Sequence, residues 1–224
     1  MLKYTLFFTL FLSFTLSLQA QKPAPAEKSD PEAKKVLDRI RKKYEGYKSV
    51  EAAFTLTIEI ADQPKEVQKG IVNQDGDKFR LDMDQQVIAS DGKTTWVYLK
   101  KNNEIQITDT DPNDENGFLT PKDLLSRYQK GDFLYAIIDK VSEKGRVLTQ
   151  IEFKPKSKSS EYAKIRVSIN EKAGTIESIK AIAKDASRYT FQITKLTPNK
   201  TYPAGFFQLK SSDYPGVHVE DLRM

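Results

Sequence analysis

The chain lacks the residue types on which many catalytic and metal sites depend. Its 224 residues include no cysteine, and His218 is the only histidine. The absence of cysteine excludes disulfides, thiolate chemistry and lipid attachment through a cysteine of this chain. A lone imidazole has no second imidazole or thiolate with which to hold zinc, and it offers little to a hydrolytic triad. We therefore expect His218 to lie on the surface or on an edge strand.

Motifs for other chemistry are missing as well. No Gly-x-Ser-x-Gly turn, glycine-rich phosphate loop or dinucleotide fingerprint occurs in the sequence. Asp82 and Asp84 share one face of an expected strand, but turns flank them, so solvated carboxylates explain them better than a glycosidase pair. Residues 109–120 alternate like a calcium loop, yet Asp114 replaces the required glycine and Thr120 replaces the closing glutamate. We expect a protein that is not an enzyme and that holds no cofactor or metal.

Long apolar runs are confined to the N-terminus. Lys3 gives a positive start, residues 4–18 form an apolar run rich in Leu and Phe, and Ala20 supplies a small residue at a cleavage point. This pattern is typical of a secretory signal peptide, and the run is too short for a stable membrane-spanning helix. We expect a cleaved signal over residues 1–20, a flexible tether over residues 21–29 and a single domain over residues 30–224. The mature protein is then a soluble protein of the periplasm.

The net charge of +5 comes from 36 basic and 31 acidic residues that are interspersed along the chain. This distribution is typical of a solvated, mixed surface. A mild attraction to an anionic membrane face or an acidic partner is the functional alternative. No basic stretch carries interleaved aromatic residues, so nucleic acid is not an expected partner.

The hydrophobic period changes from helical to alternating near residue 50. Asp30 and Pro31 are suited to begin a helix, and apolar residues three or four apart continue it to about Gly46. A second helix is expected to open at Thr120 and Pro121, and a short helical pattern continues over residues 133–138. Alternating segments joined by turns predict antiparallel strands. These strands are expected near residues 50–60, 67–74, 79–83, 87–90, 94–99, 104–108, 147–153, 162–170, 175–183, 188–196 and 206–209.

The expected fold is mainly β with α, namely an open antiparallel half-barrel of about ten to eleven strands capped by about three short helices. Such helices can cover an apolar face without filling it and so leave a hydrophobic cavity, although a solid core fits the same periodicity. The candidate side chains of the cavity and its lid are Val36, Ile40, Phe54, Leu56, Ile58, Phe79, Leu81, Trp96, Tyr98, Leu124, Leu125, Phe153, Ile165, Val167 and Phe191.

Several motifs, taken in order, resemble the outer membrane lipoprotein carrier (LolA) family over nearly the whole mature chain. The most specific is the hairpin at residues 90–98, Ser-Asp-Gly-Lys-Thr-Thr-Trp-Val-Tyr, which is close to the family's Ser-Asp-Gly-Lys-Thr-x-Trp-x-Tyr. The other markers are the helix leading to Tyr-Lys-Ser-Val-Glu-Ala-Ala-Phe at residues 47–54, Lys69-Gly70 followed by residues 77–81, the lid-like residues 119–125, and residues 153–156, 174–176 and 214–219.

The resemblance implies an open half-barrel around a hydrophobic cavity and a periplasmic carrier function. Such a carrier takes lipoproteins from an inner-membrane lipoprotein-releasing ABC transporter, covers their acyl chains and passes them to an outer-membrane acceptor; we expect it to be a monomer. The chain departs from the family at residues 74–77, Gln-Asp-Gly-Asp, where the family has a basic residue that couples the lid to the barrel. The alternative is a lipid-binding or lipid-sensing envelope protein on the same fold that does not carry lipoproteins.

Overall fold

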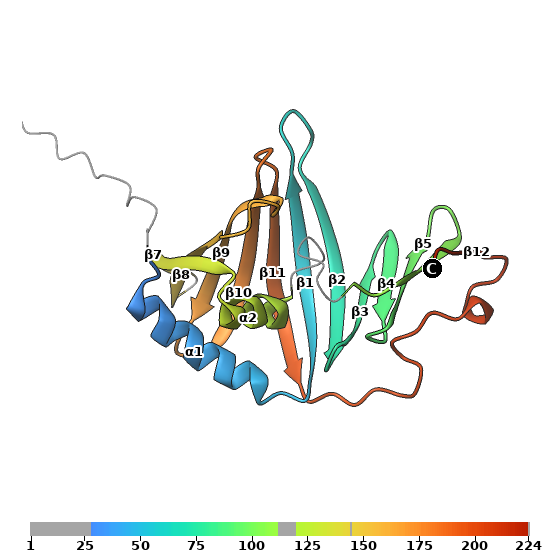
Figure 1. Cartoon of the computed structure of the whole chain (residues 1–224), viewed down its shortest axis with the longest axis horizontal. Coiled ribbons are helices and arrows are strands. Elements are labelled where there is room, and N and C mark those ends of the chain that lie inside the picture. The colour runs from blue at the N-terminus through green and yellow to red at the C-terminus, as the bar shows by residue number, and fades with distance from the viewer. Residues whose placement is uncertain (1–27, 112–119, 144, 224) are drawn as a thin grey trace, which may run out of the picture.

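The computed structural model describes residues 28–111, 120–143 and 145–223, and over these residues it shows one open sheet of twelve strands with two α-helices (Figure 1). The expected class, an open and mainly β fold, is confirmed. The expected signal peptide, most of the expected tether and residues 112–119 of the calcium-like segment lie outside the described residues. None of the described helices is long and apolar enough to cross a membrane.

The strands follow the spatial order β12-β6-β5-β4-β3-β2-β1-β11-β10-β9-β8-β7. Each neighbouring pair is antiparallel except β12 with β6, which is parallel. The bounds are β1 Ser49–Glu59, β2 Glu66–Asp75, β3 Lys78–Met83, β4 Gln86–Ser90, β5 Thr94–Leu99, β6 Glu104–Asp109, β7 Phe133–Glu143, β8 Arg146–Pro155, β9 Tyr162–Asn170, β10 Thr175–Ala183, β11 Arg188–Pro198 and β12 His218–Asp221. His218 is exposed and lies on an edge strand, as its isolation in the sequence predicts.

Helix α1 (Pro31–Glu45) begins where the sequence predicts, and it packs one apolar side against the sheet. Asp30 caps the helix, because its Oδ1 accepts a hydrogen bond from the Glu32 backbone N–H at 2.8 Å. Near the other end, the Tyr44 hydroxyl accepts a hydrogen bond from the backbone N–H of Ile176 at 3.2 Å. Burial raises the pKa of Tyr44 to about 12. The helix is thus anchored to β10 by both packing and a hydrogen bond.

Asp30 also joins α1 to the edge strand β7. Its backbone N–H donates to the Tyr135 carbonyl at 2.8 Å, and its second carboxylate oxygen accepts from the Ile137 N–H at 3.2 Å. We expect Asp30→Ala to lower the free energy of unfolding by about 1–2 kcal/mol, because two backbone donors lose their acceptor. Asp30→Asn keeps one acceptor oxygen and should lose less. Urea unfolding measures both variants, and an unchanged midpoint for Asp30→Ala would show that the cap contributes nothing.

The third expected helix, over residues 133–138, is wrong, because these residues belong to strand β7. The segment is almost continuously apolar, so helical and strand periods fit it equally well. A register shift between Ile137 and Asp139 further obscures its alternation. The described residues therefore contain two α-helices rather than about three, with α2 at Pro121–Lys130.

The expected strand at residues 206–209 is also wrong. After β11 the chain runs across to the far half of the sheet and makes turns and a short 3₁₀ helix, η1 (Ser211–Asp213), before β12 (Figure 1). The hydrophobic side chains of this C-terminal segment (residues 199–217) act as anchors without strand pairing. Phe207 and Leu209 are buried, at 6% and 5% exposure. The apolar spacing of these residues reflects packing onto a sheet rather than a place within one.

Candidate functional site

The two faces of the sheet differ in what covers them. We call the face against which α1 and α2 pack the helix face, and the opposite one the outer face. Residues opposite one another in an antiparallel pair share a face, so the register assigns each side chain. One row of the helix face crosses five strands as Phe153, Ile165, Ala181, Tyr189 and Ile58. The face is therefore apolar without interruption from β8 to β1.

The row beside it repeats this pattern and continues the apolar surface. It runs through Ile151, Val167, Ile179, Phe191 and Leu56. These rows connect two buried clusters, a first cluster beneath α1 and α2 and a second cluster on β1, β2 and β3. Phe191 packs against both clusters, and its ring centroid lies 5.6 Å from that of Phe54.

The structure brings most of the sequence-predicted site residues together on the helix face. Those in the first cluster are Val36, Ile40, Leu124, Leu125, Phe153, Ile165 and Val167. Those in the second cluster are Phe54, Leu56 and Leu81, with Ile58 partly buried against them. Phe79 shares the same face, opposite Gln74 and Ser90. Their contact with a ligand stays a prediction.

Trp96 and Tyr98 are the exceptions, and their expected place on the inner face is wrong. Trp96 lies opposite Ala89, which lies opposite Arg80, on the outer face. Tyr98 packs there against Tyr214 of the C-terminal segment, with ring centroids 4.2 Å apart. Alternation in the hairpin separates two sets of side chains but does not say which set faces inward. The neighbouring Val97 occupies the helix face instead.

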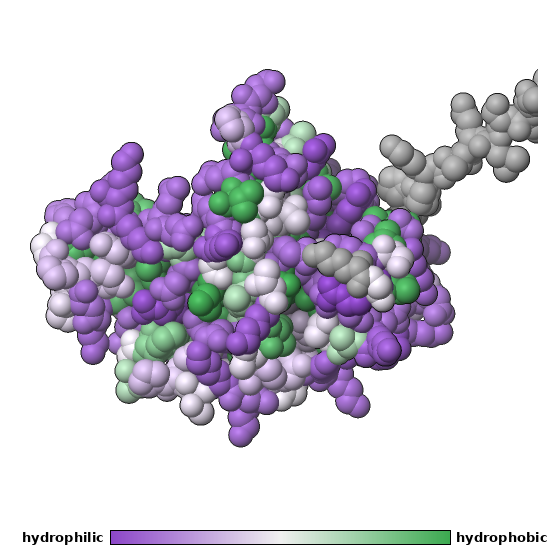
Figure 2. Space-filling model, turned by 180° about the vertical axis from the view of Figure 1, so that it is seen from behind, coloured by the Kyte–Doolittle hydropathy of each residue, from purple (hydrophilic) through white to green (hydrophobic). Residues whose placement is uncertain are grey.

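The C-terminal segment covers the outer-face side chains of β4, β5 and β6, which we call the outer patch. Leu209 is buried with Val87, Ala89 and Ile105. The Arg80 guanidinium lies 5.3 Å from the centre of the Phe206 ring, and it pairs with Asp82 at 3.0 Å. Asp82 is thus held in an ion pair with Arg80, a partner that the sequence alone did not indicate. Figure 2 shows the molecule from behind as mainly hydrophilic, with scattered hydrophobic patches.

Sequence reasoning missed several half-buried apolar side chains on the helix face. These residues pack against the second cluster while keeping partial exposure: Val50, Ile88, Tyr189 and Ile193. Tyr189 and Ile193 lie two residues before and after Phe191 along β11, so they share its face. This spacing is a signal that could have found them. Ile88 sits between two turns in a short strand, where the alternation is too brief to assign a face. Partly exposed apolar side chains of this kind are available to contact an apolar ligand.

Helix α2 lies across the helix face and is attached at both ends. The Tyr128 hydroxyl donates a hydrogen bond to Asp38 of α1 at 3.0 Å, and its ring packs on that of Tyr135. Burial and the Asp38 carboxylate raise the pKa of Tyr128, while the Lys34 ammonium lowers the pKa of Asp38. At the other end, the Thr120 hydroxyl donates to the Gln74 amide oxygen at 3.3 Å.

The described residues hold no group of three or more His, Asp or Glu side chains that is placed to bind a metal ion. The chemistry that the helix face offers is instead apolar contact, over an area that spans both halves of the sheet. Figure 1 shows α1 and α2 in front of the strands from β7 to β11, so the second cluster lies beside the helices rather than beneath them.

Comparisons with known proteins agree with this architecture. The family model described as outer membrane lipoprotein carrier protein LolA matches residues 45–210. Among solved structures, an uncharacterized conserved protein from Thermus thermophilus gives a TM-score of 0.55 at 12% identity, covering 86% of this chain and 99% of that one. The LolA superfamily protein NE2245 from Nitrosomonas europaea gives a TM-score of 0.44 at 12% identity, covering 79% of this chain and 97% of that one. The similarity to the Thermus thermophilus protein, at 12% identity, shows that the two chains share a fold.

A sequence relative covers a shorter stretch. The uncharacterized protein MJ0687 from Methanocaldococcus jannaschii is 33% identical over 72 residues, which are 32% of this chain and 22% of that protein. The match therefore spans only about a fifth of that relative.

Proposed function

The chain belongs to the outer membrane lipoprotein carrier protein LolA family, and we propose that it is a periplasmic carrier that shelters the acyl chains of lipoproteins on its helix face. The observation that carries the proposal is the apolar surface that continues past α1 and α2. The described members of the second cluster all come from strands, and half-buried side chains such as Ile58, Ile88 and Ile193 border it. We propose that this surface and α2 enclose a hydrophobic cavity when an acyl chain is bound.

The energetics of acyl chains favour such a surface. Each CH₂ group gains about 0.8 kcal/mol when it leaves water, so a lipoprotein cannot cross an aqueous space unprotected. A carrier must also release its cargo, which requires a cover that opens at modest cost. Helix α2 is tied by the Tyr128–Asp38 and Thr120–Gln74 hydrogen bonds. Each contributes about 0.5–1.5 kcal/mol net, more where a charge accepts, so opening is accessible to a ligand or a partner.

The Thr120–Gln74 contact supports a lid that is coupled to the sheet by a neutral pair. Residues 74–77, where the resemblance implies a basic residue, include instead the Gln74 amide, which reaches the residue before α2. We infer that α2 is the lid and that Gln74 takes part in its attachment. A neutral attachment responds less to salt than an ion pair does.

The proposed partners follow from family membership. An inner-membrane lipoprotein-releasing ABC transporter would load the carrier, and an outer-membrane acceptor would receive the cargo. The protein would act as a monomer, without enzyme activity or a cofactor. The alternative is a lipid-binding or lipid-sensing envelope protein on the same fold, and the absence of a basic residue from residues 74–77 is the observation that favours it.

Native mass spectrometry of the protein purified from the periplasm, with extraction of any bound lipid, tests the proposal. We expect a triacylated lipoprotein to co-purify. A bound glycolipid or free fatty acid would favour the alternative function. A protein that is repeatedly empty would contradict acyl binding by the helix face.

A matched pair of isoleucine substitutions tests which face binds. Ile58 lies on the helix face, and Ile71, at 42% exposure, lies on the outer face of the neighbouring strand opposite Asp82. We expect Ile58→Asn to weaken binding of a fluorescent fatty acid by about tenfold or more, since an isoleucine contact contributes about 1.5–3 kcal/mol. Ile71→Asn should change it less than twofold. Equal losses in both variants, with folding checked by circular dichroism, would remove the helix face from the site.

A further inference from the structure

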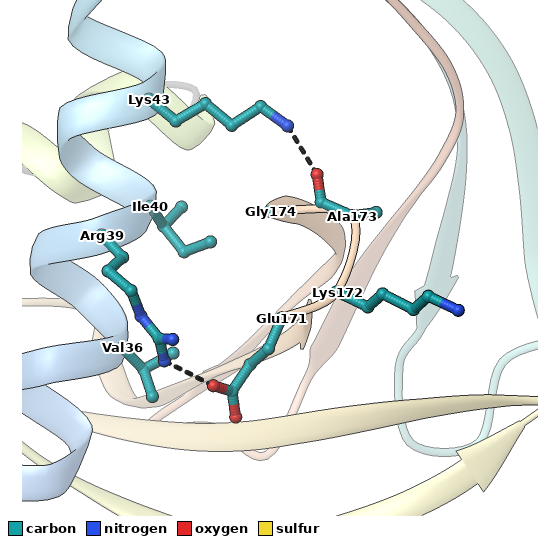
Figure 3. A pocket seen from close by; sticks show the side chains of 8 residues that line it. All are labelled: Val36, Arg39, Ile40, Lys43, Glu171, Lys172, Ala173 and Gly174. Atoms are coloured by element: carbon teal, nitrogen blue, oxygen red, sulfur yellow. Dashed lines mark hydrogen bonds and ion pairs between the residues drawn. The ribbon is translucent and has the colours of Figure 1, made fainter.

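A pocket of about 230 Å³ lies between α1 and the turn that joins β9 to β10 (Figure 3). Its apolar part comes from Val36 and Ile40 of α1. Its remaining lining residues are Arg39, Lys43, Glu171, Lys172, Ala173 and Gly174. Three of these residues are cationic and one is anionic, so the lining is positively charged.

The single carboxylate of the pocket is already engaged. Glu171 accepts a hydrogen bond from the Thr149 hydroxyl at 2.6 Å and an ion-pair hydrogen bond from Arg39 at 2.6 Å. The Thr149 hydroxyl and then Arg39 hold the pKa of Glu171 below its usual range. Glu171 therefore stays ionised and positions the Arg39 guanidinium at the pocket, rather than competing for a ligand.

Arg39 and Lys43 keep donors for a ligand. The Lys43 ammonium donates to the Ala173 carbonyl at 2.5 Å, and the Arg39–Glu171 bond uses one terminal nitrogen. A guanidinium carries five N–H donors and an ammonium carries three. Figure 3 shows both side chains reaching from α1 toward the turn on either side of Ile40, whereas Lys172 extends away.

The turn itself is shaped to let Lys43 approach. Gly174 has a φ of +65°, and a Cβ added there would lie 3.1 Å from Lys43 Cδ and 3.2 Å from Nζ. A larger residue would be strained in this conformation and would push the lysine aside. The glycine thus allows the ammonium to lie over the turn, at the pocket.

We propose that this pocket binds a phosphate group, carried either by a phospholipid headgroup or by a small soluble phosphate ester. An arginine fork matches phosphate oxygens in a bidentate manner, and a lysine adds a compact positive charge. Val36 and Ile40 form the apolar side of the pocket, which can contact the C–H groups of the ester bound to the phosphate. The charged residues of the pocket are not among the candidate side chains of the helix face, so the inference does not depend on what that face binds.

The test compares the double variant Arg39→Gln, Lys43→Gln with a charge-matched control, Arg188→Gln, Lys195→Gln, whose residues are exposed on β11. The soluble probes are inorganic phosphate and glycerol 3-phosphate, followed by NMR shifts of residues 171–174. The membrane probe is co-sedimentation with phosphatidylcholine vesicles, with and without phosphatidylglycerol. We expect the pocket variant to weaken binding about tenfold, the loss of two screened charge contacts, and the control variant to bind as the wild type does.

The outcomes separate the two sources of phosphate. Binding of glycerol 3-phosphate without vesicle binding supports a soluble ester, and phosphatidylglycerol-dependent sedimentation that the pocket variant loses supports a headgroup. If the control variant loses as much binding as the pocket variant, the loss comes from the lower net charge and the proposal is overturned. A wild type that binds neither probe overturns it as well. Binding of a fluorescent fatty acid should be unchanged in the pocket variant, which keeps this test separate from that of the carrier function.

Discussion

Deleting residues 200–224 is expected to lower the melting temperature by about 10 °C or more and to make the protein prone to aggregation. The C-terminal segment buries Phe207 and Leu209, and such side chains contribute about 1.5–3 kcal/mol each. A loss of several kcal/mol corresponds to this shift for a chain of this size. The deletion also uncovers Val87 and Ile105, which are 4% and 1% exposed. Without β12, strand β6 becomes an open edge that can pair with other chains.

The matched control for this deletion removes only residues 222–224, beyond the end of β12, and should leave the melting temperature within about 2 °C. Differential scanning calorimetry and light scattering measure the two effects. If the long deletion melts like the full chain, the segment contributes no stability despite its buried side chains.

Trp96→Asp should act in the same way as the long deletion, because it disturbs the same outer patch. It should lower stability while the folded fraction still binds an acyl probe.

Gly70→Ala is expected to destabilise the protein by about 2–3 kcal/mol, although it adds a single methyl group to a strand. An added Cβ would lie 2.5 Å from the tip of the Phe54 ring and 2.9 Å from the backbone oxygen of Asp82. The ring can rotate, but the backbone of β3 can move only if the sheet shifts. Phe54 lies on the helix face against Phe191, so the displaced ring should also weaken binding of an acyl probe.

Urea unfolding and a fluorescent fatty acid titration measure both effects of Gly70→Ala. Adding Phe54→Leu should recover part of the lost stability, because the smaller side chain vacates the space over residue 70. The stability that the double variant still lacks measures the contact of the added Cβ with the Asp82 carbonyl. If Gly70→Ala unfolds at the wild-type midpoint, the close approach of Phe54 to Gly70 does not exist in solution.

The first half of the sheet is readable from the sequence because its information is local. Residues 50–108 alternate cleanly and carry strong turn residues, so they predict six strands close to the observed bounds. Helix α1 has a cap, a proline at its start and a clear apolar side. The predictions are wrong where tertiary packing, rather than the local sequence, determines the structure. Residues 133–138 have no distinctive period, and residues 206–209 are anchors that resemble a strand.

The candidate site is partly predictable for a similar reason. Alternation selects residues that share a face, so it groups Phe54, Leu56 and Ile58 correctly. It does not say which face is inside. In the 90–98 hairpin the large apolar side chains, Trp96 and Tyr98, lie on the outer face, which the C-terminal segment covers. The Gln74–Thr120 contact and the pairing of Lys43 with Ala173 join residues far apart in the chain. No local pattern indicates such contacts.

The pairing of β1 with β11 sets the order in which the molecule can be assembled. Strands β1–β6 and β7–β11 are two meanders whose internal pairs are local. Within the described sheet they pair with each other only through β1 and β11, for example where Ala52 lies opposite Leu196. Closing so long a loop is slow compared with forming hairpins, so this seam is expected to close late in folding. Phe54 and Phe191 meet across that seam, and competence for an acyl ligand should therefore appear only with the last step. Until β11 has been made, β1 is an apolar edge without its partner, and that edge must be kept from other chains for most of the chain's synthesis.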